Sequence, residues 1–369
     1  MVSELISFYP DQMEICLSER CNFECDYCFM NKSCSENLSF EGAAKGVEHF
    51  LSSGRKIVTI TFNSGEPLIN FKILKKVIGY IFSRSEELNI QARIVVTTNC
   101  LLLNRKIFDY FSKDKRLMLN ISLDGMKDFH DKHRKIKGRE RVSSFDMIWN
   151  NISNITKEGI RVISTVTPEN ISHISDNLEF LMRNGFRKFD IFPQMFTVYN
   201  KGQLEIFKEQ IDHVNSIILK EKFNGTDTDI FLTNRVWGRT CYNKILLGSD
   251  GRFYLFDAIT ILPYEKRENY AIGDIHRGIN YRKRVELFNS IIKDVNGSAN
   301  YKCSSCKLYG MCLLPIPLYL WCKDRGKPFM KYLNSFCKIA EILISLNVQN
   351  KLIMNEAQNK ILSGRNGCG

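Results

Sequence analysis

The chain has 369 residues and a formal net charge of +12, with 44% hydrophobic and 25% charged residues. This composition is that of a globular protein with a substantial core, and it excludes a fibrous or low-complexity chain. No stretch approaches the roughly 18 apolar residues of a membrane span, and the N-terminal region lacks the apolar run of a signal peptide. We therefore expect a cytoplasmic protein without a membrane partner, whose 13 cysteines stay reduced.

The positive charge is distributed along the chain. Lys and Arg often stand beside Glu or Asp, as in "DKHRKIKGRERVSSFD" and "EKRENYAIGD". This mixture favours a solvated basic surface over a dedicated nucleic-acid groove. A nucleic-acid partner is therefore not expected.

Short β-branched apolar runs alternate with amphipathic stretches through the first part of the chain. The runs predict strands at 13–18, 56–62, 92–98, 116–123, 160–167 and 188–193. The stretches at 39–54, 70–88, 143–159 and 170–185 predict helices, several of which open on a capping residue and close on Gly. This alternation predicts an α/β fold, a partial (β/α)6 TIM-like barrel over residues 1–200.

The pattern changes after a long predicted helix at 201–223, within a bridging segment that we assign to 201–236. Residues 237–340 contain shorter predicted strands, turns and six of the cysteines, and we assign them to a second module of α+β character. The last residues, 341–369, are predicted to form a C-terminal helix followed by a flexible tail, "SGRNGCG".

Three cysteines lie close together directly after the first predicted strand. Cys21, Cys25 and Cys28 have the spacing C-x3-C-x2-C, with no fourth cysteine at a matching distance. A tetrahedral zinc site takes four ligands and disulfides take pairs. Three thiolates suit a 4Fe–4S cluster whose fourth iron is left open to a ligand outside the protein. Taken alone, the trio is also compatible with chance or with part of a zinc site.

With Tyr27 before the third cysteine, this loop resembles the C-x3-C-x-aromatic-C signature of the radical S-adenosylmethionine (SAM) superfamily. The resemblance implies that SAM binds the open iron and that the reduced cluster splits SAM to a 5′-deoxyadenosyl radical. It also implies an electron donor such as flavodoxin or ferredoxin.

Segments that follow the next three predicted strands resemble the SAM-binding motifs of the same superfamily. The resemblance implies that the segment Ser64–Gly65–Glu66–Pro67 receives the SAM amino group, with Glu66 as the nearest charged group, and that Arg134 lies near the SAM carboxylate. Each segment ends a strand, so all are expected on the face of the barrel where active sites form. The residues assigned to SAM binding in this way are Ser64, Gly65, Glu66, Pro67, Asn99, Ser122, Asp124 and Arg134.

Other thiols and imidazoles in this half are expected to be ordinary. Cys16, Cys34 and Cys100 are interpreted as unligated thiols, because small buried thiols are common. His130 and His133 form an H-x2-H pair, but without a third ligand nearby a loop or surface role is favoured over a metal site.

A second set of cysteines lies in the C-terminal module. Cys303, Cys306 and Cys312 have the spacing C-x2-C-x5-C, and Cys337 follows. The pattern resembles the SPASM domain, an extension of radical SAM enzymes that modify peptides and proteins. It implies one auxiliary 4Fe–4S cluster held by four thiolates, suited to electron transfer or structural support. A four-cysteine zinc site is the competing interpretation of the spacing alone.

The module departs from the full SPASM pattern, which carries two auxiliary clusters. Phe256 stands where relatives have a hairpin cysteine, and the cysteine after Cys312 is Cys322, ten positions on. We therefore predict a single auxiliary cluster. Cys241 and Cys322 are interpreted as leftover thiols, a non-standard ligand pair or substrate-facing groups.

Asp257 directly follows Phe256. In relatives that oxidise a peptidyl serine or cysteine, an aspartate at this place serves as the base. Held in the apolar hairpin "FYLFDAI", Asp257 is expected to have a raised pKa and to accept a proton as a catalytic residue. A turn residue or a structural hydrogen bond is the alternative.

Together the resemblances imply a ribosomally made precursor peptide as substrate and a thioether or carbon–carbon cross-link as product. Because about a dozen residues precede the first predicted strand, leader recognition is expected to use the barrel surface, the basic face or a separate leader-binding protein. The alternatives are a sulfatase-maturing enzyme that makes formylglycine, a radical SAM enzyme acting on a small molecule or RNA, and a non-catalytic metal-binding protein.

Overall fold

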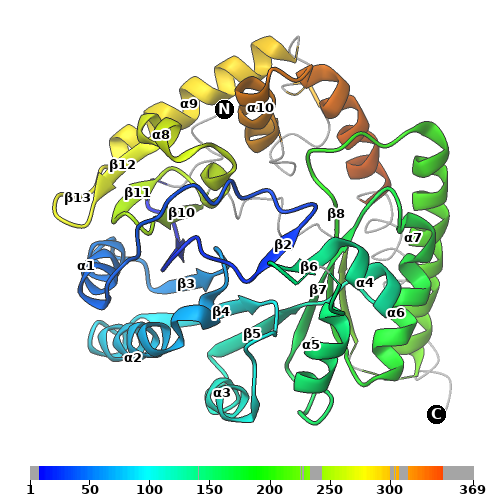
Figure 1. Cartoon of the computed structure of the whole chain (residues 1–369). Coiled ribbons are helices and arrows are strands. Elements are labelled where there is room, and N and C mark those ends of the chain that lie inside the picture. Colours follow the sequence, from blue (N-terminus) through cyan, green and yellow to red (C-terminus); the bar gives the residue numbers. More distant parts are fainter. Residues whose placement is uncertain are drawn as a thin grey trace, which may run out of the picture.

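A computed structural model describes residues 8–139, 141–224, 226, 228–232, 243–299, 303, 305–306 and 315–343. Within them, one eleven-stranded sheet has the order β13-β12-β11-β10-β1-β3-β4-β5-β7-β8-β9. Its parallel strands curve into an incomplete barrel, and α1, α2, α3, α5, α6 and α7 cover the outer side (Figure 1).

The barrel strands follow the predicted runs closely. Their bounds are β1 Gln12–Ile15, β3 Ile57–Phe62, β4 Gln91–Thr98, β5 Leu117–Ser122, β7 Arg161–Val166 and β8 Lys188–Pro193. The covering helices are α1 Phe40–Leu51, α2 Phe71–Glu87, α3 Arg105–Phe111, α5 Ser144–Ile152, α6 Ile174–Arg183 and α7 Lys201–Phe223. All six predicted strands and the five predicted helices up to residue 223 are confirmed, whereas α3 was not predicted.

Buried and more exposed side chains alternate along the strands, as expected for a barrel wall with helices on one face. In β4, the side chains of Ala92, Ile94 and Val96 are buried, whereas Arg93, Val95 and Thr97 are more exposed. Successive residues of a strand point to opposite faces. The apolar set therefore packs under the helices, and the more polar set faces the inner side of the barrel.

Two further parallel strands extend the barrel on its two flanks. β9 (Asp229–Leu232) pairs with β8, and β10 (Lys244–Leu247) pairs with β1. β11 (Arg252–Tyr254), β12 (Ala271–Asp274) and β13 (Gly278–Ile279) continue the sheet in antiparallel order. Because one sheet crosses from β1 into β10, the domain boundary near residue 237 stays a prediction.

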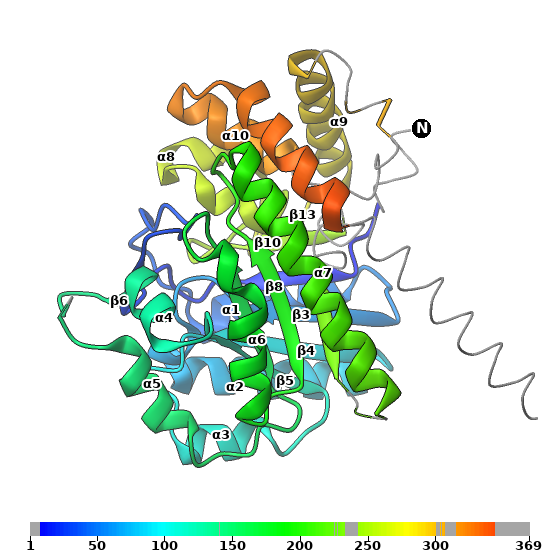
Figure 2. The same ribbon diagram turned by 90° about the vertical axis from the view of Figure 1, so that its right-hand side faces the viewer.

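The C-terminal module contains more helix than its sequence indicated. Besides the expected short strands and turns, residues 237–343 contain α9 (Tyr281–Ser298), α10 (Pro315–Arg325) and a helix at 329–343. A short 3-10 helix, η4 (Asp257–Ile261), and α8 (Tyr264–Arg267) connect β11 to β12. These helices lie together at one end of the barrel (Figure 2).

Every described helix is too short or too polar to cross a membrane. The expected C-terminal helix is described only up to residue 343, where it continues the helix that begins at residue 329. The predicted tail, Cys241 and Cys312 lie outside the described residues.

Candidate functional site

The three N-terminal cysteines surround a short strand that the sequence did not reveal. β2 (Phe23–Cys25) pairs antiparallel with β6 (Arg134–Ile136), and Cys25 stands opposite Arg134 in this pairing. Beyond the strand, the Cys28 N–H donates to the carbonyl of Cys25 at 3.0 Å and closes a turn. The pairing anchors the cysteine loop to the segment that follows α4 (Lys127–His133).

The thiols share one electrostatic environment. Burial raises the pKa of Cys21, and it raises the pKa of Cys25 to about 12. Burial alone would lower the pKa of Lys32, but the nearby thiols of Cys28, Cys21 and Cys25 raise it overall. Lys32 therefore supplies a positive charge next to all three sulfurs, where an anionic iron–sulfur group would need one.

The donor set fits a cubane cluster better than a single ion. Among the residues that the structure describes, no three His, Cys, Asp or Glu side chains converge to hold one metal ion. In a 4Fe–4S cube each thiolate binds its own iron, so the sulfurs need not point at one centre. Three thiols with a shared cation are compatible with that arrangement.

The loop after β3 packs directly against the cysteine loop. Gly65 has a positive φ of 63°, and a Cβ placed there would lie 2.5 Å from the Ser18 carbonyl oxygen and 2.6 Å from that of Arg20. The Glu66 N–H donates to the Arg20 carbonyl at 2.9 Å. Only glycine has room at this close approach.

Glu66 does not present a free carboxylate. One oxygen, Oε1, accepts the Thr98 hydroxyl at 2.8 Å and the Leu68 N–H at 3.0 Å, and Oε2 accepts the Asn99 N–H at 2.8 Å. The side chain is buried, and burial raises its pKa. Within the protein it joins the ends of β3 and β4, and its place at the SAM amino group stays a prediction.

Arg134 and Asp124 bind each other. Arg134 donates from Nε at 2.9 Å and from Nη2 at 3.1 Å, and the same carboxylate accepts the Tyr27 hydroxyl and the Thr165 N–H. Both charged side chains are buried. The Arg134 guanidinium is held by Asp124, and its place near a SAM carboxylate stays a prediction. The aromatic residue of the cysteine signature is fixed in the same network.

His130 is buried in α4, so the expected loop or surface role is wrong. Its Nδ1 accepts the Asp124 N–H at 3.4 Å, and its Nε2 has no hydrogen-bond partner among the described residues. Burial lowers the pKa of His130 to about 4. The imidazole is thus neutral in the folded protein.

This burial predicts an acid-sensitive fold. In the unfolded chain the His130 pKa is near the ordinary value of 6.5, so stability is retained above that pH and lost as pH falls toward 4. Between pH 7 and pH 5, the free energy of unfolding of the iron-free native protein, measured with urea, should fall by about 2 kcal/mol more than that of a His130→Gln variant. A His173→Gln variant, altered at an exposed histidine, should follow the native curve. Parallel curves for the native protein and His130→Gln would contradict the prediction.

A second buried network lies where β1 meets β10. The Lys244 ammonium donates to Asp257 at 2.7 Å and to Glu14 at 3.0 Å, and the Ser64 hydroxyl donates to Glu14 at 2.5 Å. Burial alone would lower the pKa of Lys244, but Asp257 and Glu14 raise it well above its usual value. The expectation of apolar surroundings for Asp257 is wrong, because a buried ammonium contacts its carboxylate.

Sequence reasoning missed Glu14 and Lys244. The available signal was a charged residue inside each of two otherwise apolar runs, "MEICLS" and "KILLGSD". Such a residue in a buried strand requires a partner of opposite charge. The sequence did not show that β1 and β10 are neighbours, so the partner could not be named.

The inner side of the barrel holds polar atoms with no partner among the described residues. They are Thr61 Oγ1, Asn120 Oδ1 and Asn22 Nδ2, and all three are buried. Asn99 is close by, because its Nδ2 donates to Asn22 Oδ1 at 2.7 Å and lies 3.8 Å from Cys21 Sγ. Buried polar groups without partners are costly. A polar ligand such as SAM, bound beside the cysteine loop, is compatible with them and with the half-exposed Ser122.

The described cysteines of the C-terminal module gather around one small apolar cluster. Cys303 and Cys337 both pack against it, and the Cys306 N–H donates to the Cys303 carbonyl at 3.2 Å. Cys322 lies inside the cluster at 1% exposure, and burial raises its pKa to about 11. This arrangement is compatible with one auxiliary cluster and with Cys322 as a core thiol. That ligand set stays a prediction.

A family model for the radical SAM superfamily matches residues 15–181. An uncharacterised protein of Methanocaldococcus jannaschii is 26% identical over 177 residues, covering 47% of this chain and 60% of that protein. The match thus spans less than two thirds of that relative. A cysteine-type anaerobic sulfatase-maturating enzyme of Clostridium novyi is 25% identical over 330 residues, 80% of this chain and 84% of that enzyme.

Solved structures share the fold at low identity. anSMEcpe with bound AdoMet and the Cp18Cys peptide has a TM-score of 0.64 at 17% identity, over 93% of this chain and 99% of that chain. Streptococcus suis SuiB bound to its precursor peptide SuiA has a TM-score of 0.53 at 14% identity, over 85% and 73%. The predicted fold class, a partial barrel with a SPASM-like C-terminal module, is confirmed.

Proposed function

We propose that this radical SAM enzyme, whose radical SAM domain spans residues 15–181, oxidises a ribosomally made peptide and forms a thioether or carbon–carbon cross-link in it. Cys21, Cys25 and Cys28 would hold the 4Fe–4S cluster that binds SAM. When bound, that pair of cofactors supplies a 5′-deoxyadenosyl radical able to remove a hydrogen atom from carbon. The protein contributes binding, orientation and exclusion of competing reactions.

The observation that carries the proposal is the exposure of the inner side of the barrel. Thr97, Ser122, Thr165 and Phe192 stand near the C-terminal ends of β4, β5, β7 and β8, and all are partly exposed. Their outward-facing neighbours in these strands are mostly buried under helices. Small-molecule sites usually enclose most of their ligand. A solvent-reachable wall of three hydroxyl side chains and one phenylalanine better suits an extended chain that enters from outside.

The buried networks around this wall would keep the reacting groups in place. Glu66 fixes the ends of β3 and β4, and the Asp124–Arg134 pair fixes β6 against the end of β5. Both networks are satisfied within the protein, so they need not rearrange when a substrate binds. Such preorganisation lowers the cost of holding a side chain in a reactive geometry.

Asp257 remains our candidate for the residue that handles a proton of the substrate. Its side chain is 24% exposed, whereas its partner Lys244 is 10% exposed. The carboxylate therefore reaches the surface of the network and can meet a substrate, while Lys244 anchors it from behind. One auxiliary cluster at Cys303, Cys306, Cys312 and Cys337 would accept the second electron of the oxidation.

Formylglycine formation is the second candidate, because this chain aligns with most of the length of one enzyme named for sulfatase maturation. The sulfatase-maturating enzyme of Clostridium novyi aligns over 84% of its own length. Two features favour a different reaction. Phe256 replaces the hairpin cysteine of such relatives, and Lys244 contacts Asp257. We therefore rank this candidate below a cross-linking peptide maturase.

The two candidates differ in their products. Reconstituted enzyme, SAM and a reductant, incubated with cysteine-containing peptides, should give a product lighter by two hydrogen atoms that resists fragmentation between the linked residues. The product should not react with a hydrazide, and Asp257→Asn should reduce its yield without reducing 5′-deoxyadenosine release. A hydrazide-reactive aldehyde would support formylglycine formation instead. Unchanged peptides despite rapid SAM cleavage would contradict both candidates.

A further inference from the structure

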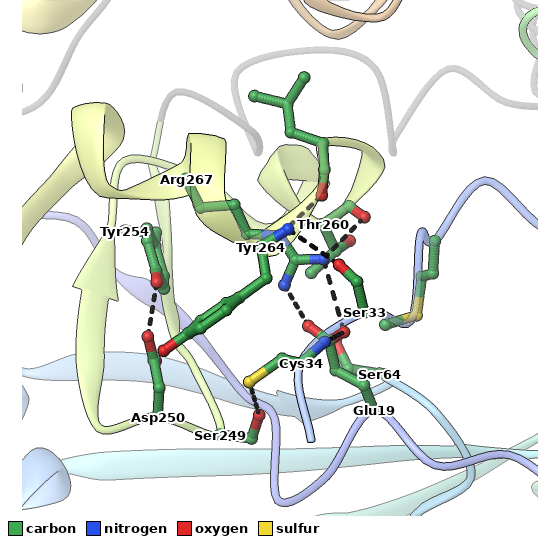
Figure 3. Close-up of polar contacts among 12 residues, drawn as sticks. Glu19, Ser33, Cys34, Ser64, Ser249, Asp250, Tyr254, Thr260, Tyr264 and Arg267 are labelled. Carbon is green, nitrogen blue, oxygen red and sulfur yellow. Dashed lines mark hydrogen bonds and ion pairs between the residues drawn. The ribbon is translucent and has the colours of Figure 1, made fainter. Parts of the chain in front are cut away.

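A buried ion pair connects the cysteine loop to the C-terminal module (Figure 3). Glu19 stands two residues before Cys21, and Arg267 ends α8. The Arg267 guanidinium contacts Glu19 Oε1 from Nη1 and Oε2 from Nη2, the latter at 3.4 Å. Each side chain is only 3% exposed. A pair so deeply buried links two segments that are far apart in the sequence.

The same carboxylate also closes the cysteine loop on itself. Glu19 Oε2 accepts the Cys34 N–H at 3.0 Å. Residues 19 and 34 bracket the three cysteines, so both ends of the loop meet at one side chain. Beyond Cys34, the Ser249 hydroxyl donates to its sulfur at 3.4 Å, which fixes this end against the turn after β10 (Figure 3).

Arg267 holds the other side of the contact. Its Nε donates to the Leu262 carbonyl at 2.8 Å, and its Nη2 donates to the Thr260 carbonyl at 3.3 Å. The guanidinium thus fixes the end of η4, the helix that begins with Asp257, and the residue that follows it. Its side chain touches both this segment and the carboxylate at the base of the cysteine loop.

Backbone contacts run parallel to the ion pair. The Asn31 N–H donates to the Thr260 carbonyl at 2.8 Å, and the Tyr264 N–H donates to the Ser33 hydroxyl at 2.8 Å. Residues 31–34 therefore lie along residues 260–267. The position of the loop after Cys28 is set by the C-terminal module as well as by the barrel.

The chemistry of the pair suits a positioning role. Removing one partner of a buried pair leaves an uncompensated charge, whereas removing both charges together is often tolerated. Arginine serves here because its planar guanidinium donates in several directions at once, and lysine lacks that geometry. Fold stability and loop position can therefore be separated by mutation.

We propose that Glu19 and Arg267 are positioning residues that fix the three cysteine thiols relative to the C-terminal module. The inference rests on the proposed role of these thiols as cluster ligands. A change in the position of the C-terminal module would therefore move the cysteine loop through this pair, although neither side chain is assigned as a ligand. Arg267 thereby joins the segment carrying Asp257 to the loop that starts the reaction.

The test compares three full-length variants. Arg267→Met leaves Glu19 unpaired. Glu19→Gln/Arg267→Met removes both charges but retains an acceptor for the Cys34 N–H. Arg161→Met removes a partly buried cation elsewhere in the barrel, which pairs with Asp190 and Asp229. The iron-free form of each variant is measured for unfolding by urea and for hydrogen exchange of residues 31–34. The cluster-loaded form is measured for the electron paramagnetic resonance of the reduced cluster, with and without SAM, and for 5′-deoxyadenosine release at saturating SAM.

The double variant should unfold near the native urea midpoint but exchange residues 31–34 faster. The change that SAM causes in its electron paramagnetic resonance should differ from that of the native protein. Its 5′-deoxyadenosine release should fall about tenfold, which corresponds to an activation free energy higher by about 1.4 kcal/mol. Arg161→Met should lose stability but keep the native resonance and rate. Native exchange, resonance and rate in the double variant would overturn the proposal.

Failure of the proposed function would look different. If the native protein itself bound no cluster at the three cysteines, the chemistry assigned to them would be refuted. Hydrogen exchange of residues 31–34 in iron-free protein would still decide whether Arg267 holds the loop. Unchanged exchange in both Arg267 variants would reject the positioning role without reference to any cofactor.

Discussion

Replacing Cys25 by alanine is expected to abolish SAM cleavage, with a loss of at least about 1,000-fold in 5′-deoxyadenosine release, equivalent to about 4 kcal/mol. Cys25 ends β2 and stands opposite Arg134 in the only pairing that β2 makes in the described part of the chain. A cube held by two thiolates would have a second open iron and would be lost on purification. Iron content, visible absorption and product release measure the effect.

Cys306→Ala is the matched control for this prediction. It removes a cysteine from the second set, which lies in a different module, so the N-terminal cluster should form. SAM cleavage should remain within about threefold of the native rate, while peptide product is lost with the auxiliary cluster. Full SAM cleavage by the Cys25→Ala protein would refute the assignment of the N-terminal cysteines.

Gly65→Ala is expected to destabilise the protein by about 2–4 kcal/mol and to weaken SAM binding. A Cβ at this position would lie 2.5 Å from the Ser18 carbonyl oxygen, and the positive φ of 63° is unfavourable for alanine. The strain falls on backbone atoms of the cysteine loop, which have no flexible end that can move aside. Thermal unfolding of iron-free protein and SAM titration of reconstituted protein measure the two effects.

Gly79→Ala provides the control, because the same change has nothing within 4 Å of the new Cβ there. Gly79 lies within α2, where alanine is favoured over glycine by about 1 kcal/mol. This variant should be as stable as the native protein or more so, with unchanged SAM affinity. Equal stability losses for the two variants would show that the close approach at Gly65 carries no strain.

Periodicity predicted the barrel well because each strand and helix satisfies a local rule. β4 and β5 are apolar on every second residue, and α1 begins at Ser39, whose side chain accepts the Gly42 N–H at 3.0 Å. These signals require no knowledge of distant parts of the chain. The C-terminal module was less well predicted, since α9 and α10 lie in a region where the cysteine pattern dominated the interpretation.

For the candidate site, too, local features could be read from the sequence, whereas contacts between distant segments could not. Spacing singled out the three cysteines, because ligand type leaves a mark in a short stretch of sequence, whereas Gly65 and Asp257 were assigned by resemblance. The partners of the charged residues were not predicted. Resemblance assigned Glu66 and Arg134 to SAM binding, which stays a prediction, and the structure adds their contacts with Asn99 and Asp124.

By itself the sequence determined a βα-repeat fold, the cysteine trio after the first strand and the second cysteine set, since each depends on residues that are neighbours along the chain. Only the tertiary structure decided that Lys244 lies between Glu14 and Asp257, and that Arg267 reaches Glu19 across 248 positions. The physical reason is that a buried charge must be compensated, and a linear pattern shows the charge without showing which distant segment brings its partner.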